Sequence, residues 1–452
     1  MKKITLFLLL FLCLFLTSCG EKTVTPETRS FAEAHDGFAT KLTKQLNDKN
    51  EIPASPKGVF NLDDYQTKAG KLAAYVSCDP GDGQKHPLII WVIGGWGYGI
   101  SDYFWSYPDW ADDQTASGFR EAGILMMYPS FRGANGNPGY YETLFGEIDD
   151  IAAAYEYAAK LPYVDPNRVY LGGHSTGGTR VLLASEYTDK FRAVFSFGPV
   201  DEIKNHNKSQ FTFDLNNPEE AKLRSPIYWL SDIKSPTFVI EGADGNLDCL
   251  RNMEKATQNK NIHFFKVNGT DHYGTLAPIT RLLAAKILKD TGAKVNITLS
   301  QQELQEAMKQ PPITPMPIMT PFSDQELGVS FLLPAIWQEG RDENGTYFSS
   351  SYDGENFWDR SIMSVDVYSS DSDNTYGSIV SEMNKAGFKG GQDVIGGQPG
   401  YKAELLEDKK FYRTAIAQKG GKTFLFTFEV KPDYQKPADI MFQKIIGSIA
   451  FE

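Results

Sequence analysis

The chain has 452 residues, 41% of them hydrophobic and 23% charged, so it is long enough for two or three domains and is neither fibrous nor wholly disordered. Its 57 acidic residues outnumber its 45 basic ones and give a net charge of −12. This acidic balance argues against nucleic acid or an anionic membrane surface as a partner, because both require a basic protein face.

The first residues are interpreted as an export signal. Two lysines precede an apolar run over residues 4–16, which is too short for the ~30 Å hydrocarbon core of a bilayer but suits a signal peptide. The sequence Leu-Thr-Ser-Cys at 16–19 resembles the bacterial lipobox, which implies that the sulfur of Cys19 carries lipid. We therefore expect 1–19 to be a lipoprotein signal peptide and the protein to be held in the bacterial cell envelope, on the periplasmic or cell-surface side. The alternative is an uncleaved signal anchor.

Two cysteines remain in the body of the chain, Cys78 and Cys249. One possible pair is not a disulfide framework, and the Cys and His spacings do not resemble a metal site. No metal and no cofactor are predicted.

Strand-like and helix-like segments alternate over most of the chain. Residues 20–56 are polar and are expected to be a tether with one packed helix around 31–46. From 57 to 290, continuous apolar runs predict strands buried on both faces of a parallel sheet, and helical spacings lie between them. The runs lie at 88–93, 124–128, 169–171, 193–197, 238–240 and 262–267. This alternation predicts an α/β fold with a mostly parallel sheet and helices on both faces. The segment 200–235 breaks the pattern and is expected to form a lid or pocket wall.

A second, smaller domain is predicted after this one. The alternation of strands and helices stops around residue 291, and 291–321 is interpreted as a proline-rich linker, whose residues 311–321 are expected to be stiff and extended. Residues 322–452 then show alternating strand patterns, with helices expected at 379–385 and 438–446. We expect an α+β module without a chemical motif of its own.

The sequence Gly173-His174-Ser175-Thr176-Gly177 has the pattern G-x-S-x-G. It follows a predicted strand and opens a predicted helix, which is the context that exposes a nucleophilic serine on a strained turn. The helix N-terminus also favours the negative charge that develops beside Ser175 during acyl transfer. Ser175 is therefore the candidate nucleophile. The alternative is a glycine-rich turn that serves packing alone.

His272 is the candidate base. In the chain order Ser…Asp…His, the base follows the other two residues. His272 comes directly after the strand 262–267, at the sheet edge where Ser175 is expected. The remaining histidines lie before the serine, next to it, in the 200–235 segment or at the start of a strand: His35, His86, His174, His206 and His263.

The acid is expected in the loop after the strand 238–240, where two aspartates occur. Asp244 lies nearer the end of the strand and is favoured. Asp248 stands at the start of a predicted helix, so its alternative role is a helix N-cap. Either carboxylate would orient His272 and stabilise its imidazolium form.

Two backbone N–H groups are expected to hold the oxyanion. One belongs to Thr176, the residue after the nucleophile. The other is assigned to Trp96, in the loop Gly94-Gly95-Trp96-Gly97 that follows the strand 88–93. Glycines let such a loop turn inward, but they also suit a tight turn without a catalytic part.

With these motifs in place, residues 57–290 resemble an α/β-hydrolase of the prolyl oligopeptidase-like type. Beyond the serine motif, the resemblance is carried by the end of one strand, the start of a helix and the segments that lead into the nucleophile and acid strands. These are 128–133 (Tyr-Pro-Ser-Phe-Arg-Gly), 146–150 (Gly-Glu-Ile-Asp-Asp), 164–168, 225–227 and 233–237. The resemblance implies a serine-type peptidase or carboxylesterase that acts on a small peptide or ester.

Residues 322–452 are similar, more weakly, to PsbP-like modules of envelope proteins. This resemblance implies that the module binds an envelope partner. We therefore expect a lipid-anchored serine hydrolase with the triad Ser175, His272 and Asp244. The alternative is a catalytically silent hydrolase-fold lipoprotein that serves in binding or envelope assembly.

Overall fold

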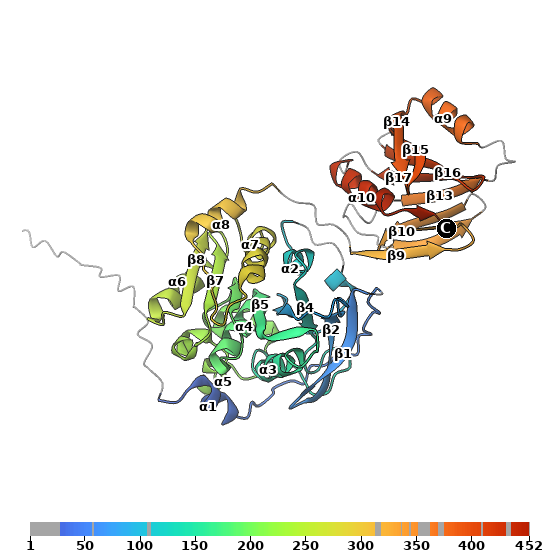
Figure 1. Cartoon of the computed structure of the whole chain (residues 1–452). Helices are drawn as coiled ribbons and strands as arrows, with labels where there is room; N and C mark the ends of the chain where they lie inside the picture. The colour runs from blue at the N-terminus through green and yellow to red at the C-terminus, as the bar shows by residue number, and fades with distance from the viewer. Residues whose placement is uncertain are drawn as a thin grey trace, which may run out of the picture.

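The computed structural model describes residues 28–56, 58–105, 110–311, 318–335, 337–342, 345–350, 362–368, 375–407, 410–430 and 435–451. The predicted signal peptide and Cys19 lie outside these residues. Figure 1 shows the chain as an N-terminal domain with mixed helices and strands and a C-terminal module built mainly of strands. Within the described residues, no helix combines the length and apolar character needed to cross a bilayer.

An eight-stranded sheet forms the centre of the N-terminal domain, in the order β1-β2-β4-β3-β5-β6-β7-β8 (Figure 1). β1 (Phe60–Thr67) and β2 (Gly70–Ser77) pair antiparallel at one edge, and β2 is also antiparallel to β4 (Leu125–Pro129). From β4 to β8 all neighbours are parallel, which confirms the mostly parallel sheet. The other strands are β3 (His86–Val92), β5 (Val164–His174), β6 (Val194–Phe197), β7 (Thr237–Gly242) and β8 (Ile262–Val267).

Helices cover both faces of the sheet because alternate strand residues supply two separate cores. Leu88, Ile90 and Val92 of β3 pack in one core with α3 (Gly146–Ala158) and α4 (Thr176–Tyr187). Ile89 and Trp91 pack in the other with α2 (Ser117–Glu121) and α7 (Leu276–Lys289). α6 (Leu247–Ala256) packs against β7 and β8. This arrangement confirms the α/β-hydrolase fold class.

A buried ion cluster explains two of the motifs that carried the family resemblance. Arg132, just after β4, donates from Nη2 to Asp150 Oδ1 at 2.8 Å and from Nη1 to Glu142 Oε1 at 3.0 Å. Asp150 lies in α3, so the cluster ties the end of β4 to this helix. Gly146 leaves room for the guanidinium, because a Cβ atom there would lie 2.0 Å from Arg132 Nη1.

The N-terminal stretch carries one packed helix, as expected. Its helix is shorter than 31–46: α1 (Phe31–Asp36) starts with a capping box at Ser30 and ends at Gly37. Phe31 is fully buried, its ring lies 5.4 Å from that of Trp229, and its backbone N–H donates to Asp232 at 2.6 Å. The stretch therefore packs on the domain.

The region 291–321, expected to be a proline-rich linker, contains a helix. α8 (Gln301–Met308) begins with a capping box in which Ser300 and Glu303 bond each other's backbone N–H. Leu304 is fully buried, and α8 contacts α7 and β8. α8 thus belongs to the N-terminal domain, and β9 (Met319–Asp324) already begins the next module.

The C-terminal module is an α+β unit, as expected. β9 pairs with β10 (Val329–Pro334), which pairs with β18 (Ala450–Phe451), all antiparallel. A seven-stranded antiparallel sheet has the order β11-β12-β13-β17-β16-β15-β14. Its elements are β11 (Trp337–Asp342), β12 (Gly345–Ser350), β13 (Ile362–Tyr368), β14 (Lys389–Ile395), β15 (Gln398–Glu407), β16 (Lys410–Lys419) and β17 (Lys422–Val430), with α9 (Tyr376–Lys385) and α10 (Gln435–Gly447).

Candidate active site

Ser175 stands on a strained turn between β5 and α4. Its backbone has φ 56° and ψ −118°, outside both the helical and the extended regions. Non-glycine residues adopt such a conformation at a cost of about 1–3 kcal/mol, and they do so mainly at functional sites. The flanking glycines are required by contact: a Cβ atom at Gly177 would lie 2.1 Å from the carbonyl oxygen of Val92, and one at Gly173 would lie 2.7 Å from that of Gly177. The turn therefore has the geometry of a nucleophile elbow.

His272 follows β8 and lies at the same carboxyl edge of the sheet. Its Nδ1 is 3.1 Å from Glu241 Oε2 at the end of β7. Its ring centroid is 4.5 Å from that of His174, the residue before the serine. Gly198, just after β6, supports the ring from another side, since a Cβ atom there would lie 2.4 Å from His272 Cε1. The structure thus places His272 at the same edge of the sheet as Ser175, next to the residue that precedes the serine.

The carboxylate that meets His272 is Glu241, which the sequence analysis missed. Its side chain is 1% exposed. Besides facing Nδ1, it accepts the backbone N–H of Gly242 at 2.7 Å and of Asn246 at 2.9 Å. Gly245 leaves space for the carboxylate, because a Cβ atom there would lie 2.4 Å from Glu241 Oε1. These bonds fix the carboxylate in the orientation that meets the imidazole.

The two predicted acids do not occupy this place, and the prediction of Asp244 or Asp248 is corrected. Asp244 is exposed, and its backbone N–H donates to the Thr270 carbonyl oxygen at 3.2 Å. The Asp248 side chain is 94% exposed and pairs with Arg251 at 3.6 Å. Asp248 is not the N-cap of α6 either, since Asn246 holds that position.

The physical reason lies in side-chain length. Glu241 lies near the end of β7, and its longer side chain reaches the histidine that the shorter side chain of an aspartate would reach only from further along the loop. The signal was present, because Glu241 directly follows the predicted strand 238–240, and hydrolases of this fold use either Asp or Glu as the acid.

The expected oxyanion loop lies against the nucleophile turn. The Thr176 hydroxyl donates to the Gly95 carbonyl oxygen, and the Gly94 N–H donates to Gln114 Oε1 at 3.2 Å. A Cβ atom at Gly94 would lie 3.1 Å from Ser175 Cβ, so a glycine lets the loop approach the serine. Gly95 has φ +74°, which glycine adopts readily. The structure therefore brings Thr176 and the loop that carries Trp96 together beside Ser175.

The segment 200–235 contributes an aromatic wall next to this loop. The Trp96 ring lies 5.3 Å from the ring of His206 and 6.2 Å from that of Phe211. His206 also contacts the hydroxyl of Thr179 at 3.3 Å. Burial, together with the charges of Arg180 and His272, lowers the pKa of His206 to about 3, so this imidazole is neutral near pH 7. The segment is built from turns, short 3-10 helices and the short helix α5 (Pro218–Lys222).

One side-chain cluster has the composition of a metal site, but a lysine bridges it. His35, Asp36 and Asp149 place ligand atoms within 4.8 Å of one another. The Lys68 ammonium group lies between the two carboxylates, at 3.1 Å from Asp36 and 2.8 Å from Asp149. This ammonium group already supplies the positive charge that the two carboxylates need.

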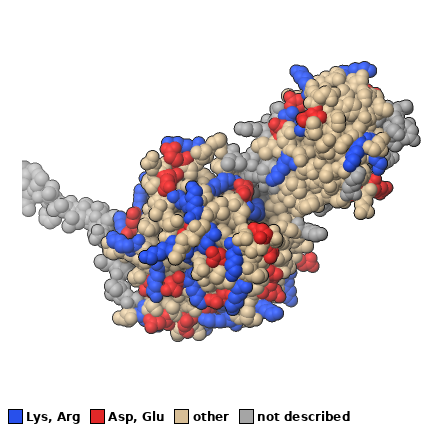
Figure 2. Space-filling view, viewed as in Figure 1, with Lys and Arg blue, Asp and Glu red and all other residues tan. Residues whose placement is uncertain are grey.

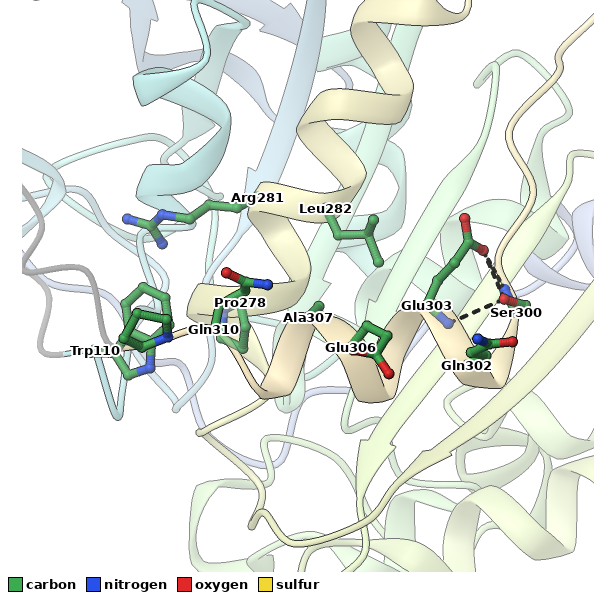
Figure 3. Close-up of a pocket in the computed structure, with 11 residues that line it drawn as sticks. Trp110, Pro278, Arg281, Leu282, Ser300, Gln302, Glu303, Glu306, Ala307 and Gln310 are labelled. Atoms are coloured by element: carbon green, nitrogen blue, oxygen red, sulfur yellow. Dashed lines mark hydrogen bonds between the residues drawn. The ribbon is translucent and has the colours of Figure 1, made fainter.

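The rest of the structure offers a groove, a mixed surface charge and two cysteines. A groove of about 570 Å³ lies between α7 and α8, with Trp110, Leu282 and Ala307 among its lining residues, and neither Ser175 nor His272 lines it (Figure 3). Figure 2 shows basic and acidic side chains interspersed over the face of the N-terminal domain in view. Cys78 and Cys249 are free thiols.

Comparison with known proteins supports the class of the domain. The model of the prolyl oligopeptidase family matches residues 110–256, which include Ser175 and Glu241. The quorum-quenching protein AidA of Acinetobacter baumannii is 32% identical over 79 residues, which are 18% of this chain and 26% of that protein. The uncharacterized peptidase YtmA of Bacillus subtilis is 26% identical over 139 residues, which are 27% of this chain and 53% of that protein. The chain thus spans about half the length of these relatives or less.

Solved structures show similarity over about half of the chain. A puromycin-hydrolyzing peptidase of Mycobacterium tuberculosis is 20% identical with a TM-score of 0.43, over 52% of this chain and 39% of that one. An esterase of Pyrobaculum calidifontis is 16% identical with a TM-score of 0.39, over 52% of this chain and 87% of that one. The family match bears out the predicted serine-hydrolase class for the domain that carries Ser175.

Proposed function

We propose that the protein is a serine hydrolase of the prolyl oligopeptidase-like type, with the triad Ser175, His272 and Glu241. The observation that carries the proposal is the pairing of His272 Nδ1 with the buried Glu241 carboxylate, 3.1 Å apart, beside a serine at φ 56° on a strand-to-helix turn. A packing turn needs neither the strained serine nor a histidine held by a buried acid.

Each step of the proposed reaction uses one of these groups. Ser175 Oγ attacks the substrate carbonyl carbon while its proton passes to His272 Nε2, the ring nitrogen turned away from Glu241. Glu241 stabilises the imidazolium ion and keeps the proton of Nδ1 in place. The N–H groups of Thr176 and Trp96 hold the oxyanion. His272 then returns its proton to the leaving amine or alcohol, and water releases the acyl group in a second round.

The substrate is proposed to be a small peptide or an ester, because acyl transfer through a serine serves both. The match to a peptidase family favours a peptide or amide bond. We further propose that Cys19 anchors the enzyme by lipid in the bacterial envelope and that the PsbP-like module at 322–452 binds an envelope partner. The lipobox and the strand pattern of the module support these two points.

The proposal is tested by hydrolysis of p-nitrophenyl esters and aminoacyl p-nitroanilides by the purified protein and its Ser175→Ala variant. We expect turnover by the wild type and loss of at least ~10³-fold in the variant. Equal rates in both proteins would contradict the proposal. A folded wild type that cleaves neither class would favour the alternative, a silent binding or assembly lipoprotein.

A further inference from the structure

His174 is a buried histidine beside Ser175 that the proposed reaction does not use. It ends β5, and its side chain is 0% exposed. Its Nε2 lies 3.0 Å from the backbone carbonyl oxygen of His272. Its Nδ1 faces Gln114 Oε1 at 3.4 Å, the same oxygen that accepts the Gly94 N–H. His174 therefore stands between the loop that carries His272 and the loop expected to hold the oxyanion.

The hydrogen bond to His272 fixes the tautomer of His174. Both ring nitrogens face an acceptor oxygen, and a neutral ring can donate to only one of them; the shorter contact, 3.0 Å from Nε2 against 3.4 Å from Nδ1, places the proton on Nε2. The ring also remains uncharged, because burial and the neighbouring charge of His272 lower the pKa of His174 to about 3. Near neutral pH, His174 therefore offers an uncharged N–H donor to the backbone of His272.

The backbone of His272 needs such support because its side chain joins two distant groups. The loop crosses closely over the end of β7, where a Cβ atom at Gly242 would lie 1.9 Å from the Asp271 carbonyl oxygen. In the proposed reaction the ring keeps Nδ1 on Glu241, 3.1 Å away, and presents Nε2 to Ser175. A small shift of the loop would break one of these contacts, and misplacement by about 1 Å can cost ~10²-fold in rate.

We propose that His174 is a positioning residue that holds the backbone of His272 and so keeps the His272 ring between Glu241 and Ser175. The proposal rests on the proposed function of these three residues. It also explains why a neutral ring is suitable here, since the ring centroids are 4.5 Å apart and a charge on His174 would oppose the imidazolium ion that forms on His272.

Two substitutions separate the hydrogen bond from the packing. His174→Gln places an amide N–H where Nε2 lies and stays neutral, whereas His174→Leu fills similar space without a donor. We expect His174→Leu to lower kcat by about 30- to 100-fold with KM changed less than threefold, and His174→Gln to restore kcat to within about fivefold of the wild type. If the leucine variant does not fold, His174→Asn replaces it, because its shorter amide does not reach the carbonyl.

A second readout keeps the inference separate from the proposed function. The proton on His272 Nδ1, shared with Glu241, can be followed by NMR as a downfield imidazole resonance whether or not the protein turns over substrate. We expect the resonance in the wild type and in His174→Gln, and its loss or broadening in His174→Leu. An unchanged resonance and kcat within threefold in His174→Leu, or equal losses in the leucine and glutamine variants, would overturn the inference. An inactive wild type with this resonance intact would instead count against the proposed function.

Discussion

Replacing Glu241 by glutamine tests the corrected acid most sharply. The carboxylate accepts from His272 Nδ1 and from the backbone N–H groups of Gly242 and Asn246. The glutamine amide keeps one acceptor oxygen, but its N–H₂ group cannot accept from these three N–H donors. His272 then favours the tautomer with its proton on Nε2, which cannot accept the proton of Ser175.

The expected magnitudes follow from these contacts. The equivalent change in a serine protease triad costs about 10⁴ in kcat, which is about 5 kcal/mol of transition-state stabilisation. Loss of a charge-assisted bond to backbone N–H costs about 1.5–3 kcal/mol of stability. A domain with an unfolding free energy of about 5–15 kcal/mol survives that loss, so Glu241→Gln should remain folded while nearly inactive.

The assay combines kcat on a p-nitrophenyl ester with urea unfolding of the same samples. Asp244→Asn is the matched control: its side chain is exposed, and we expect kcat within twofold and unaltered stability. A loss of 10³-fold or more in Asp244→Asn, with Glu241→Gln still active, would refute the assignment. The acid would then move to the loop that the sequence first indicated.

Three further predictions concern the anchor, the domain boundary and a buried acid. Cys19→Ser should abolish palmitate labelling and release the protein from membranes, and a variant that stays labelled and membrane-bound would contradict the lipoprotein interpretation. A chain that ends after Pro311 should keep its folded N-terminal domain and esterase activity, whereas one that ends at 291 lacks α8 and should lose stability, both measured by thermal unfolding. Glu186 is 4% exposed, neither carboxylate oxygen has a hydrogen-bond partner among the described residues, and burial raises its pKa well above the usual value. The folded state then keeps a proton that the unfolded chain releases above pH 4.5, so this group destabilises the fold increasingly as pH rises. Glu186→Gln should therefore raise the unfolding free energy at pH 8, by up to about 1.4 kcal/mol per pH unit between the two pKa values, and have little effect at pH 4.

The sequence reveals those features that depend on local pattern. The run at 88–93, which forms β3, is apolar on both faces because its alternate residues pack in two different cores. The serine motif predicts the turn after β5 because its glycines are the residues that so tight a turn requires. The place of His272 at the sheet edge is predicted from its position after a strand, because parallel strands end at one edge of the sheet, and from the elimination of the other histidines. The carboxylate beside His272 is missed, because an aspartate or a glutamate, at different distances from the end of the strand, can bring a carboxylate to the same point.

The helices outside the sheet are misjudged for a different reason. α1 is short because Gly37 ends it, and its burial depends on Trp229, almost two hundred residues away in the chain. α8 carries a local signal, the capping box of Ser300 and Glu303, but it lies beyond residue 291, where the alternation of strands and helices stops, and was therefore assigned to the linker. The role of the C-terminal module and the identity of its partner depend on the surface of the module, and a strand pattern does not reveal which side chains form that surface.

Labelling by a fluorophosphonate probe tests the central claim most directly, because only a serine activated by a neighbouring base reacts. After treatment and proteolysis, mass spectrometry locates the adduct. The account predicts one adduct, on Ser175, in the wild type, none in Ser175→Ala, and strongly slowed labelling in His272→Gln and Glu241→Gln. A folded wild-type protein that remains unlabelled, or that carries its adduct on another serine, would contradict the account.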